Sequence, residues 1–537
     1  MQTSDWKRAL EAWRAALGVE HVCVDGPPLD TLRSNVSGLR RRIPALLRPA
    51  STEEVQQVVR IANECGTPIH AVSRGGNWGL GSALPVHDDT AVMELSRMNR
   101  ILEVNADRHY AVVEPGVTQG QLHEYLVEHD VPLILYVTGS GRQTSLIGNA
   151  LERGIGYFAS HADKLSGLEV VLGNGEIIRT GFAHWPDSQV APLYRHGLGP
   201  DLGALFSQSN YGVVTKAGIE LMPTPEKQVC VIARIADETR FVPFFDALAR
   251  LRQRGVMQTV WHVGNRARSE IALGPLVYDR LAREGRGPAE TRRRDALALI
   301  AGEGFGPWSA VGGLMGTRRM VRAACREIRS VMKGIADVRF LDDQRIAKAR
   351  RVLKLLSFME GARRKAIMLD AMEPLYGLSK GVPTDAALKS VLWAVEEDTD
   401  RDVRNPDASQ SGLLYVLPLI PLSGAVAREV LHVADRVFGA HDFVPYTTLN
   451  FVNDRVVEAV INLAFDRRDP DRAEAAHRCV EELTGLYMRM GYTPYRLGIQ
   501  SMGLALDVED SYWRTVRDLK QALDPNHIMA PGRYNLI

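Results

Sequence analysis

Four glycines occur within the nine residues 73–81, whose sequence is Ser-Arg-Gly-Gly-Asn-Trp-Gly-Leu-Gly. The short apolar run 68–72 precedes them, so a strand is expected to lead into this loop. Glycines allow positive φ and let backbone N–H groups approach an anion with no Cβ in the way. We interpret the loop as a cradle for the pyrophosphate of a nucleotide, and an ordinary glycine-rich turn is the alternative.

Two further loops carry the same residue types. Residues 138–149 read Thr-Gly-Ser-Gly-Arg-Gln-Thr-Ser-Leu-Ile-Gly-Asn, and residues 205–212 read Leu-Phe-Ser-Gln-Ser-Asn-Tyr-Gly before a strand-like run. Backbone amides in such loops form concave anion sites. Three loops of this kind in one region indicate the wall of a nucleotide site.

The elements that must position these loops are a few helices and a series of short strands. Residues 52–66 predict a helix, because they combine a threonine at the expected N-cap, acids in the first turn, helical apolar spacing and a terminal glycine. A second helix is expected at 118–129, and short strands are expected at 68–72, 91–95, 101–104 and 111–114. Asn174-Gly175 lies between two β-rich runs and predicts a hairpin. Because most strands follow one another without a helix between them, the predicted fold class is α+β.

Composition limits the classes of function. The 537 residues are enough for two to four domains of ~100–200 residues each. The 65 basic and 64 acidic residues leave a net charge of +1, which argues against nucleic-acid and membrane partners. The five cysteines lack metal-ligand spacing, so we expect reduced thiols and no metal site. With no signal peptide and no apolar run near the ~20 residues of a membrane span, a cytoplasmic location is predicted.

Six collinear segments resemble the FAD-binding domain of the vanillyl-alcohol oxidase / p-cresol methylhydroxylase family of flavoproteins. They are residues 48–55, 73–81, 113–118, 148–157, 167–176 and 206–215. Each segment alone is a weak signal, but their order along one chain makes the resemblance specific. Residues 523–533, Leu-Asp-Pro-Asn-His-Ile-Met-Ala-Pro-Gly-Arg, resemble the closing motif of the same family.

The resemblance implies a two-domain α+β flavoprotein in which an α/β cap covers FAD. The expected division is a lead-in at 1–42, the FAD-binding domain at 43–224, the substrate-holding cap at 225–487, and a segment at 488–537 that returns to the FAD-binding domain. The residues implied to bind FAD are Ser73, Arg74, Gly75, Gly76, Asn77, Trp78, Gly139, Ser145, Gly148, Asn149, Gly154, Tyr157, Gly212, Val213, Val214 and Arg533.

Tyr495 and Arg496 fall where the family keeps a Tyr-Arg pair that holds a substrate phenolate. An ionised phenol oxygen in a buried pocket needs a hydrogen-bond donor and a fixed cation, and arginine keeps its charge at any working pH. A structural tyrosine beside a surface arginine is the alternative. This pair is our first candidate for catalysis.

Several positions depart from the family pattern. Leu80 replaces a phenol-binding tyrosine and can neither donate nor accept a hydrogen bond. Ser140 replaces the aspartate expected beside the flavin, so a hydroxyl stands where the family has a base. Leu413 and Asn77 occupy the positions at which members or related families attach the flavin covalently, so FAD is predicted to be non-covalent. Tyr415 lies on the same strand face as Leu413 and would become the attachment site if the register differed by two residues.

His161 is a second candidate for proton transfer. It lies two residues before Asp163, in a segment two residues shorter than the family pattern. The imidazole could supply a base displaced from the position of Ser140, and a structural histidine is the alternative.

The resemblance therefore implies an FAD-dependent oxidoreductase that transfers a hydride from a small, 4-substituted phenolic or benzylic substrate to flavin N5. An oxidase or dehydrogenase of a non-phenolic alcohol, amine or biosynthetic intermediate is the alternative, and a flavin-binding protein without turnover is a further one. The expected partners are the small-molecule substrate and an electron acceptor, which is O2, a cytochrome or a quinone. We also expect a homo-oligomer.

Overall fold

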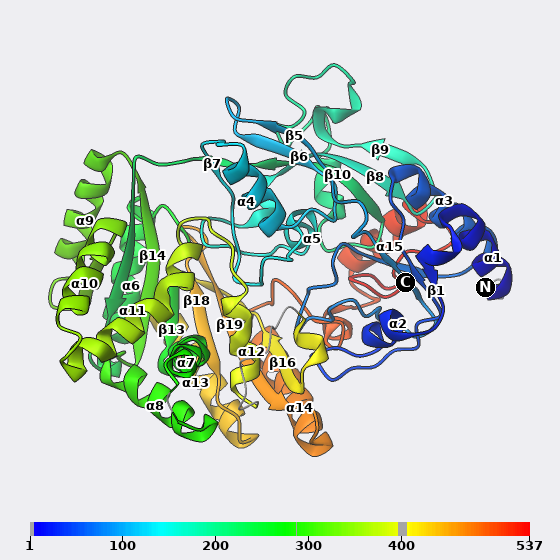
Figure 1. Ribbon diagram of the computed structural model, residues 1–537. Helices are drawn as coiled ribbons and strands as arrows, with labels where there is room; N and C mark the ends of the chain where they lie inside the picture. Colours follow the sequence, from blue (N-terminus) through cyan, green and yellow to red (C-terminus); the bar gives the residue numbers. More distant parts are fainter. Residues whose placement is uncertain (1–4, 286, 396–404) are drawn as a thin grey trace.

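The computed structural model describes residues 5–285, 287–395 and 405–537, so the expected lead-in and the expected cap each include residues outside this description. The described chain has two parts, one built on small sheets and the other on a large antiparallel sheet (Figure 1). This arrangement agrees with the predicted α+β class. Among the described helices, none is both long and apolar enough to cross a membrane.

The first small sheet has the strand order β1, β2, β4, β3, formed by Val22–Cys23, Leu46–Leu47, Ala91–Glu94 and Ile69–Val72. Helix α3 (Thr52–Cys65) connects β2 to β3, and both strands run parallel to β4. The predicted cap residue is wrong by one position, because Thr52 is already helical. The Ser51 side chain is the N-cap and accepts a hydrogen bond from the Glu54 backbone N–H at 3.2 Å. Helices α1 (Trp6–Leu17) and α2 (Pro27–Leu32) precede this sheet.

The second small sheet has the order β5, β6, β10, β8, β9, formed by Ile101–Asn105, Tyr110–Val113, Gly212–Glu220, Leu165–Leu172 and Ile177–Arg179. Helices α4 (Gln119–Glu128) and α5 (Leu146–Leu151) lie between β6 and β8 in the chain, and β7 (Leu133–Ile134) pairs with β11 (Met222–Pro223). Thr118 caps α4 as predicted. The predicted hairpin is also confirmed, since β8 and β9 pair antiparallel around Asn174-Gly175.

The large sheet contains every described strand between residues 227 and 466. Its order is β15, β12, β14, β13, β18, β19, β16, and β17 pairs with β19. The bounds are Lys227–Arg234 (β12), His262–Asn265 (β13), Trp308–Gly316 (β14), Asp337–Leu341 (β15), Ser411–Val416 (β16), Leu419–Pro421 (β17), Tyr446–Asn450 (β18) and Val456–Asp466 (β19). All of its pairs are antiparallel. As in any β-strand, successive side chains alternate between the two faces of the sheet.

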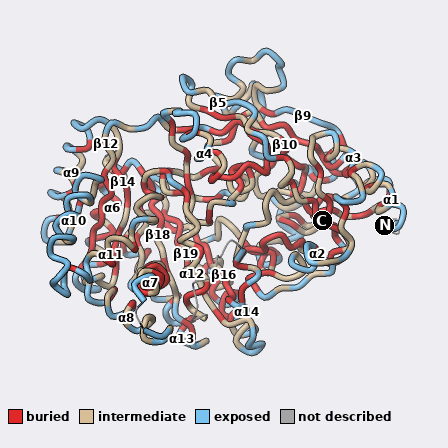
Figure 2. Tube along the Cα trace, viewed as in Figure 1, coloured by how far each residue is buried: buried red, intermediate tan, exposed pale blue. Residues whose placement is uncertain are grey.

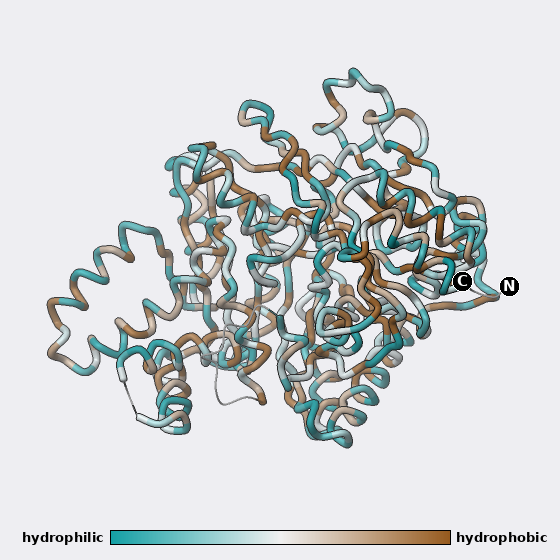
Figure 3. The backbone as a smooth tube through the Cα atoms, turned by 45° about the vertical axis from the view of Figure 1, so that its right-hand side comes forward, coloured by the Kyte–Doolittle hydropathy of each residue, from teal (hydrophilic) through white to brown (hydrophobic). Residues whose placement is uncertain are grey.

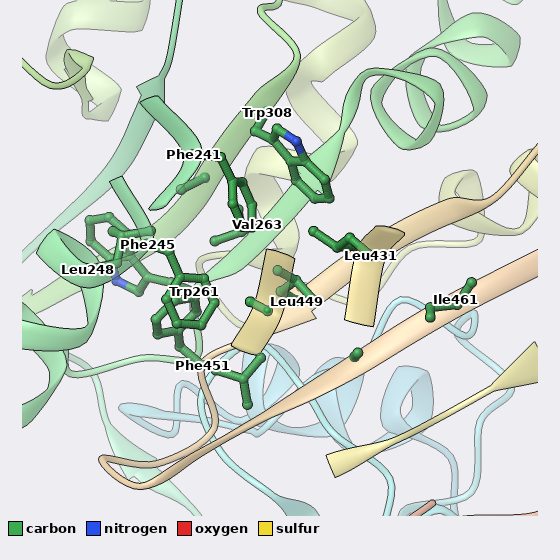
Figure 4. Packing of buried hydrophobic residues seen from close by; sticks show 14 of the residues in the cluster. Phe241, Phe245, Leu248, Trp261, Val263, Trp308, Leu431, Leu449, Phe451 and Ile461 are labelled. Atoms are coloured by element: carbon green, nitrogen blue, oxygen red, sulfur yellow. The ribbon is translucent and has the colours of Figure 1, made fainter. Parts of the chain in front are cut away.

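One face of the large sheet packs on helices α6 (Phe241–Gln253), α9 (Arg318–Met332), α13 (Gly424–Ala440) and α14 (Pro470–Arg489). The aromatic centre of this core is drawn in Figure 4, where the rings of Phe245 and Phe451 lie 4.8 Å apart and those of Phe241 and Trp308 lie 4.9 Å apart. Alternate residues of β16 and β19, such as Leu414 and Ile461, enter this core. Their neighbours in the strands therefore face the opposite side, where the substrate-sized cavity described below is located.

The opposite side of the large sheet carries helices α7 (Arg266–Arg283), α8 (Ala289–Gly302), α10 (Asp343–Leu355), α11 (Glu360–Leu378) and α12 (Lys389–Trp393). Buried residues concentrate in the strands and the inner helices, whereas α10 has no buried residue (Figure 2). The hydropathy of the chain follows the same division, with apolar stretches running through the interior (Figure 3). The sheet thus has a solid core on one side and a helix-lined space on the other.

The C-terminal segment returns to the first small sheet. After helix α15 (Ser511–Leu523), residues 528–530 run beside β3: the Ile69 N–H donates to the Ile528 carbonyl at 2.8 Å, and the Ala530 N–H donates to the Ile69 carbonyl at 2.7 Å. Lys520 and Asp524 form a fully buried ion pair at 2.5 Å, and the Lys520 ammonium also donates to the Met529 carbonyl at 2.7 Å. These contacts hold the segment against the glycine-rich loop that follows β3.

Candidate active site

Two cavities meet at the glycine-rich loop of residues 73–81. The first has a volume of about 560 Å³ and is bounded by β3, the loop after it, α5, the start of β10 and the C-terminal segment. The predicted FAD-binding residues that line it are Ser73, Arg74, Gly75, Gly76, Asn77, Trp78, Ser145, Gly148, Asn149, Gly212, Val213, Val214 and Arg533. Residues from four distant parts of the sequence therefore form one wall.

The loop is open where a phosphate group would have to lie. Gly75 has a φ of +68°, a conformation that favours glycine. A Cβ on Gly76 would meet only the Trp78 ring, at 3.6 Å, so Gly76 borders free space. Gly148 also lines this cavity and packs closely on the loop, since a Cβ on it would lie only 2.9 Å from the Ser73 hydroxyl. This arrangement fits the pyrophosphate of FAD.

The second cavity has a volume of about 800 Å³ and extends from the loop across the helix-lined side of the large sheet. It shares Gly76, Asn77, Trp78, Asn149 and Arg496 with the first cavity. The other predicted site residues that line it are Gly139, Ser140, Gly154, Tyr157 and Tyr495. Of all the predicted site residues, His161 alone lines neither cavity.

Asn149 lies at the junction of the two cavities. Its side-chain oxygen is buried and has no hydrogen-bond partner among the described residues. An unsatisfied buried acceptor is costly, and a ligand N–H group would satisfy it. The isoalloxazine ring carries such a donor, so the junction fits the flavin ring of FAD while the first cavity fits the remainder of the cofactor.

Tyr495 and Arg496 reach the second cavity from the segment after α14. The Arg496 Nη2 donates to the Asn77 Oδ1 at 2.6 Å, and the buried Arg496 Nε has no partner among the described residues. The backbone of Tyr495 is fixed by a hydrogen bond from Gln208 Nε2 at 2.9 Å and by one to the Leu417 carbonyl at 3.1 Å. Burial raises the pKa of Tyr495 and keeps its phenol a donor. A donor and a cation are therefore adjacent, as an oxyanion requires.

Leu80, Leu413 and Tyr415 also line the second cavity. Leu413 and Tyr415 project from the same face of β16, as predicted, and both approach Gly79 of the glycine-rich loop. Burial raises the pKa of Tyr415, and the charges of Arg268 and Arg496 oppose that rise. Tyr415 thus lines the second cavity together with both arginines, and it does not line the first cavity.

Ser140 and His161 differ in their placement. The Ser140 hydroxyl lines the second cavity and hydrogen-bonds the Thr144 hydroxyl at 3.0 Å. His161 is buried, and burial lowers its pKa to about 4. Its expected partner Asp163 points elsewhere and pairs with Arg195 at 2.9 Å. The structure therefore brings Ser140 to the cavity and does not assemble a His161–Asp163 pair.

Three polar residues near the cavity are missed by the sequence analysis. Glu458, on β19, is buried close to the Tyr495–Arg496 pair, and burial raises its pKa to about 8 although Arg496 and the Tyr495 phenol oppose the shift. His262 and Arg268, on β13 and α7, line the cavity itself. None of the three lies in a recognisable motif, and only the sheet topology and the chain reversal at residues 488–496 bring them to the site.

Comparisons with known proteins identify related chains along the whole length. Residues 43–181 match a family model described as an FAD binding domain, and residues 435–534 match the C-terminal domain of FAD linked oxidases. The 1'-carboxy-chondrochloren decarboxylase of Chondromyces crocatus is 33% identical, covering 100% of this chain and 98% of the relative. The flavoprotein subunit of 4-cresol dehydrogenase [hydroxylating] from Pseudomonas putida is 28% identical, covering 99% and 96%.

Two solved structures share the fold at similar coverage. P-cresol methylhydroxylase with substrate bound gives a TM-score of 0.82 at 26% identity, covering 98% of this chain and 96% of the other. The 4-ethylphenol oxidase from Gulosibacter chungangensis, in an isoeugenol complex, gives a TM-score of 0.84 at 27% identity, covering 99% and 97%.

Proposed function

This chain belongs to the vanillyl-alcohol oxidase / p-cresol methylhydroxylase family of FAD-dependent oxidoreductases, and on that premise we propose that it oxidises the benzylic carbon of a 4-substituted phenol. The observation that carries the proposal is the Arg496 guanidinium, which Asn77 holds at the junction of the two cavities. The hydride acceptor for the substrate carbon would be supplied by FAD, held by the residues that line the first cavity. The product is a quinone methide or, from an alcohol, an aldehyde.

The residues of this chain act on the other end of the substrate. The Tyr495 phenol donates to the substrate oxygen while Arg496 compensates its negative charge, so the phenolate form is favoured and pushes electrons toward the benzylic carbon. Glu458 is protonated below a pH of about 8 and so leaves the Arg496 charge available. Leu80 and Leu413 provide apolar surface that excludes water. Ser140 offers a hydroxyl and no base.

FAD is held by the residues that line the first cavity, without a covalent link. Leu413 has no atom that could form one, and the Tyr415 phenol is the alternative point of attachment. An electron acceptor is required to complete the cycle, and stopped-flow reoxidation by O2, a cytochrome or a quinone identifies it. A cytoplasmic location and a homo-oligomeric state remain parts of this proposal, and fractionation and sedimentation test them.

A second candidate function is oxidation of a non-phenolic alcohol, amine or biosynthetic intermediate. Leu80 favours it, because an apolar side chain replaces one hydrogen-bond donor of the phenolate site. Anaerobic reduction of the holoenzyme by 4-hydroxybenzyl alcohol and by 4-methoxybenzyl alcohol separates the two. Faster reduction by the ionisable substrate supports the phenolic proposal, and equal rates would replace it with the second.

A further inference from the structure

Arg268 is a cation without a counterion in the second cavity. It lies in the first turn of α7, where the Asn265 side chain caps its backbone N–H at 2.9 Å, and its half-buried side chain lines the cavity. No described residue forms a hydrogen bond or ion pair with its guanidinium. By contrast, Arg350 at the same cavity pairs with Glu373 at 2.6 Å, and Arg496 bonds Asn77.

The groups that face Arg268 cannot neutralise it. They are the phenols of Tyr157 and Tyr415 and the imidazole of His262. Burial raises the pKa of both phenols, and the charge of Arg268 opposes this rise. Burial lowers the pKa of His262 to about 4, so this ring is neutral at physiological pH. Its Nδ1 pairs with the Asn450 Oδ1 at 2.8 Å. The groups nearest the guanidinium are therefore neutral, and the two carboxylates that line the cavity pair with other cations.

Partial burial of a charged group without a partner has a desolvation cost. An anionic ligand would compensate this cost by forming charge-assisted hydrogen bonds with the guanidinium. The planar guanidinium fork matches the geometry of a carboxylate in particular. The cavity of about 800 Å³ also extends beyond the junction assigned to the flavin ring, because residues of α7, α10 and α11 line it as well. Leu273, Phe305 and Met372 supply apolar surface beyond Arg268.

We propose that Arg268 is the anchor for a carboxylate on the substrate, so that the physiological substrate is an aryl acid extended between two arginines. Tyr415 lines the same cavity as Arg268 and Arg496 and is near enough to both that their charges oppose the rise of its pKa. The assignment of a phenol to the Arg496 end rests on the proposed function. The assignment of a carboxylate to the Arg268 end rests on the unpaired guanidinium alone.

The experiment compares acids with their primary amides, which have similar size and no charge. The probes are 3-(4-hydroxyphenyl)propanoate, 3-phenylpropanoate and the amide of each, titrated into the oxidised holoenzyme with the flavin spectrum as the binding signal. Wild type is expected to bind each acid roughly tenfold or more tightly than its amide, as for a hydrogen bond between charged groups. Arg268→Gln should abolish this preference, and Arg268→Lys should restore part of it.

Arg266→Gln is the matched control, because Arg266 is exposed in the same turn of α7 and does not line the cavity. It should leave the preference for acids unchanged. The inference is overturned if wild type binds neither acid more tightly than its amide, or if Arg268→Gln weakens acid and amide by the same factor. A loss of the preference in Arg266→Gln would equally overturn it.

The same titrations separate this inference from the proposed function. If the acids bind through Arg268 but neither hydroxylated probe reduces the flavin, phenol oxidation fails and the carboxylate anchor stands. If the hydroxylated amide reduces the flavin in an Arg496-dependent manner without any preference for the acid, phenol oxidation stands and the anchor fails.

Discussion

The Arg496 guanidinium donates to the Asn77 side chain at 2.6 Å, which joins the segment after α14 to the glycine-rich loop after β3. Both residues line both cavities. Because asparagine is neutral, it fixes the position of the guanidinium without reducing its charge. The cation is thereby oriented and remains available to an anionic substrate oxygen.

Replacing Arg496 by alanine should slow flavin reduction by 4-hydroxybenzyl alcohol by roughly 10²–10³-fold, as for other donors to a developing oxyanion. Arg496→Lys should recover little, since a point ammonium does not reproduce the guanidinium fork. Single-turnover reduction of wild type and both variants measures the effect. The same loss on 4-methoxybenzyl alcohol as on the phenol would exclude phenolate activation.

Gly76→Val should yield largely apo protein that remains folded. The added side chain finds room, with only the Trp78 ring at 3.6 Å, but it occupies the space proposed for the pyrophosphate. The flavin-to-protein absorbance ratio measures occupancy, and circular dichroism checks the fold. Gly302→Val, at a position with nothing within 4 Å of its Cβ, is the control. Full FAD occupancy in Gly76→Val would refute the cradle assignment.

Acid precipitation of the wild-type protein should release FAD into the supernatant, because Leu413 cannot form a covalent bond to it. Tyr415→Phe tests the remaining alternative, since it removes only the phenol oxygen. If the colour stays with the wild-type pellet and leaves the Tyr415→Phe pellet, the flavin is attached at Tyr415 and the non-covalent prediction is wrong.

Glu458→Gln should change how the reduction rate depends on pH. In wild type, the carboxyl ionises as the pH rises through about 8 and then compensates the Arg496 charge, which weakens phenolate stabilisation. Glutamine stays neutral, so the ratio of the variant rate to the wild-type rate should rise through this pH range. Taking the ratio removes the ionisation of the substrate itself. A ratio that does not change with pH would show that ionisation of Glu458 does not affect the reduction rate.

The same shift predicts a change in stability. The pKa of Glu458 is raised from 4.5 to about 8, so the folded state binds an additional proton in that interval. Its contribution to stability is complete below pH 4.5 and is lost as the pH rises through about 8. The free energy of unfolding of Glu458→Gln, measured with urea, should lack the pH-dependent part that Glu458 contributes. The same pH dependence in the variant and in wild type would contradict the raised pKa of Glu458.

Lys520→Met should destabilise the protein by about 3–5 kcal/mol, because it leaves the buried Asp524 carboxylate without its counterion. Asp524 also accepts from the backbone N–H groups of Ile528 and Met529, so the strand beside β3 should loosen with it. Urea unfolding monitored by both flavin and tryptophan fluorescence measures the change. Lys7→Met, in helix α1, provides a comparison outside the buried pair, and equal effects would contradict the argument.

The family, the fold class and FAD as the cofactor could be predicted from the sequence, because their signals are local and collinear. Helix α3, helix α4 and the Asn174-Gly175 hairpin each carry their own cap or turn residues. The N-cap of α3 was displaced by one residue, since Ser51 and Thr52 are chemically equivalent as caps and only the backbone conformation distinguishes them.

The substrate side of the site could be predicted less well. Glu458, His262 and Arg268 are single polar residues in strands and a helix, and nothing in their neighbourhood in the sequence distinguishes them from surface positions. They reach the cavity because of strand pairing across the large sheet, which local patterns do not encode. Conversely, residues that are close in the sequence need not meet in the fold. His161 and Asp163 are two residues apart, yet Asp163 pairs with Arg195.

The pairing of residues 528–530 with β3 also bears on the order of events during synthesis. A ribosome releases β3 and the glycine-rich loop long before residues 528–533 emerge, so the nascent chain spends most of its translation with this wall of the cofactor site incomplete. Domains generally fold as units, and this one is complete only after its last segment has emerged. Cofactor loading is therefore expected to be a late, post-translational step, so FAD supply would influence the yield of the finished enzyme more than its rate of synthesis.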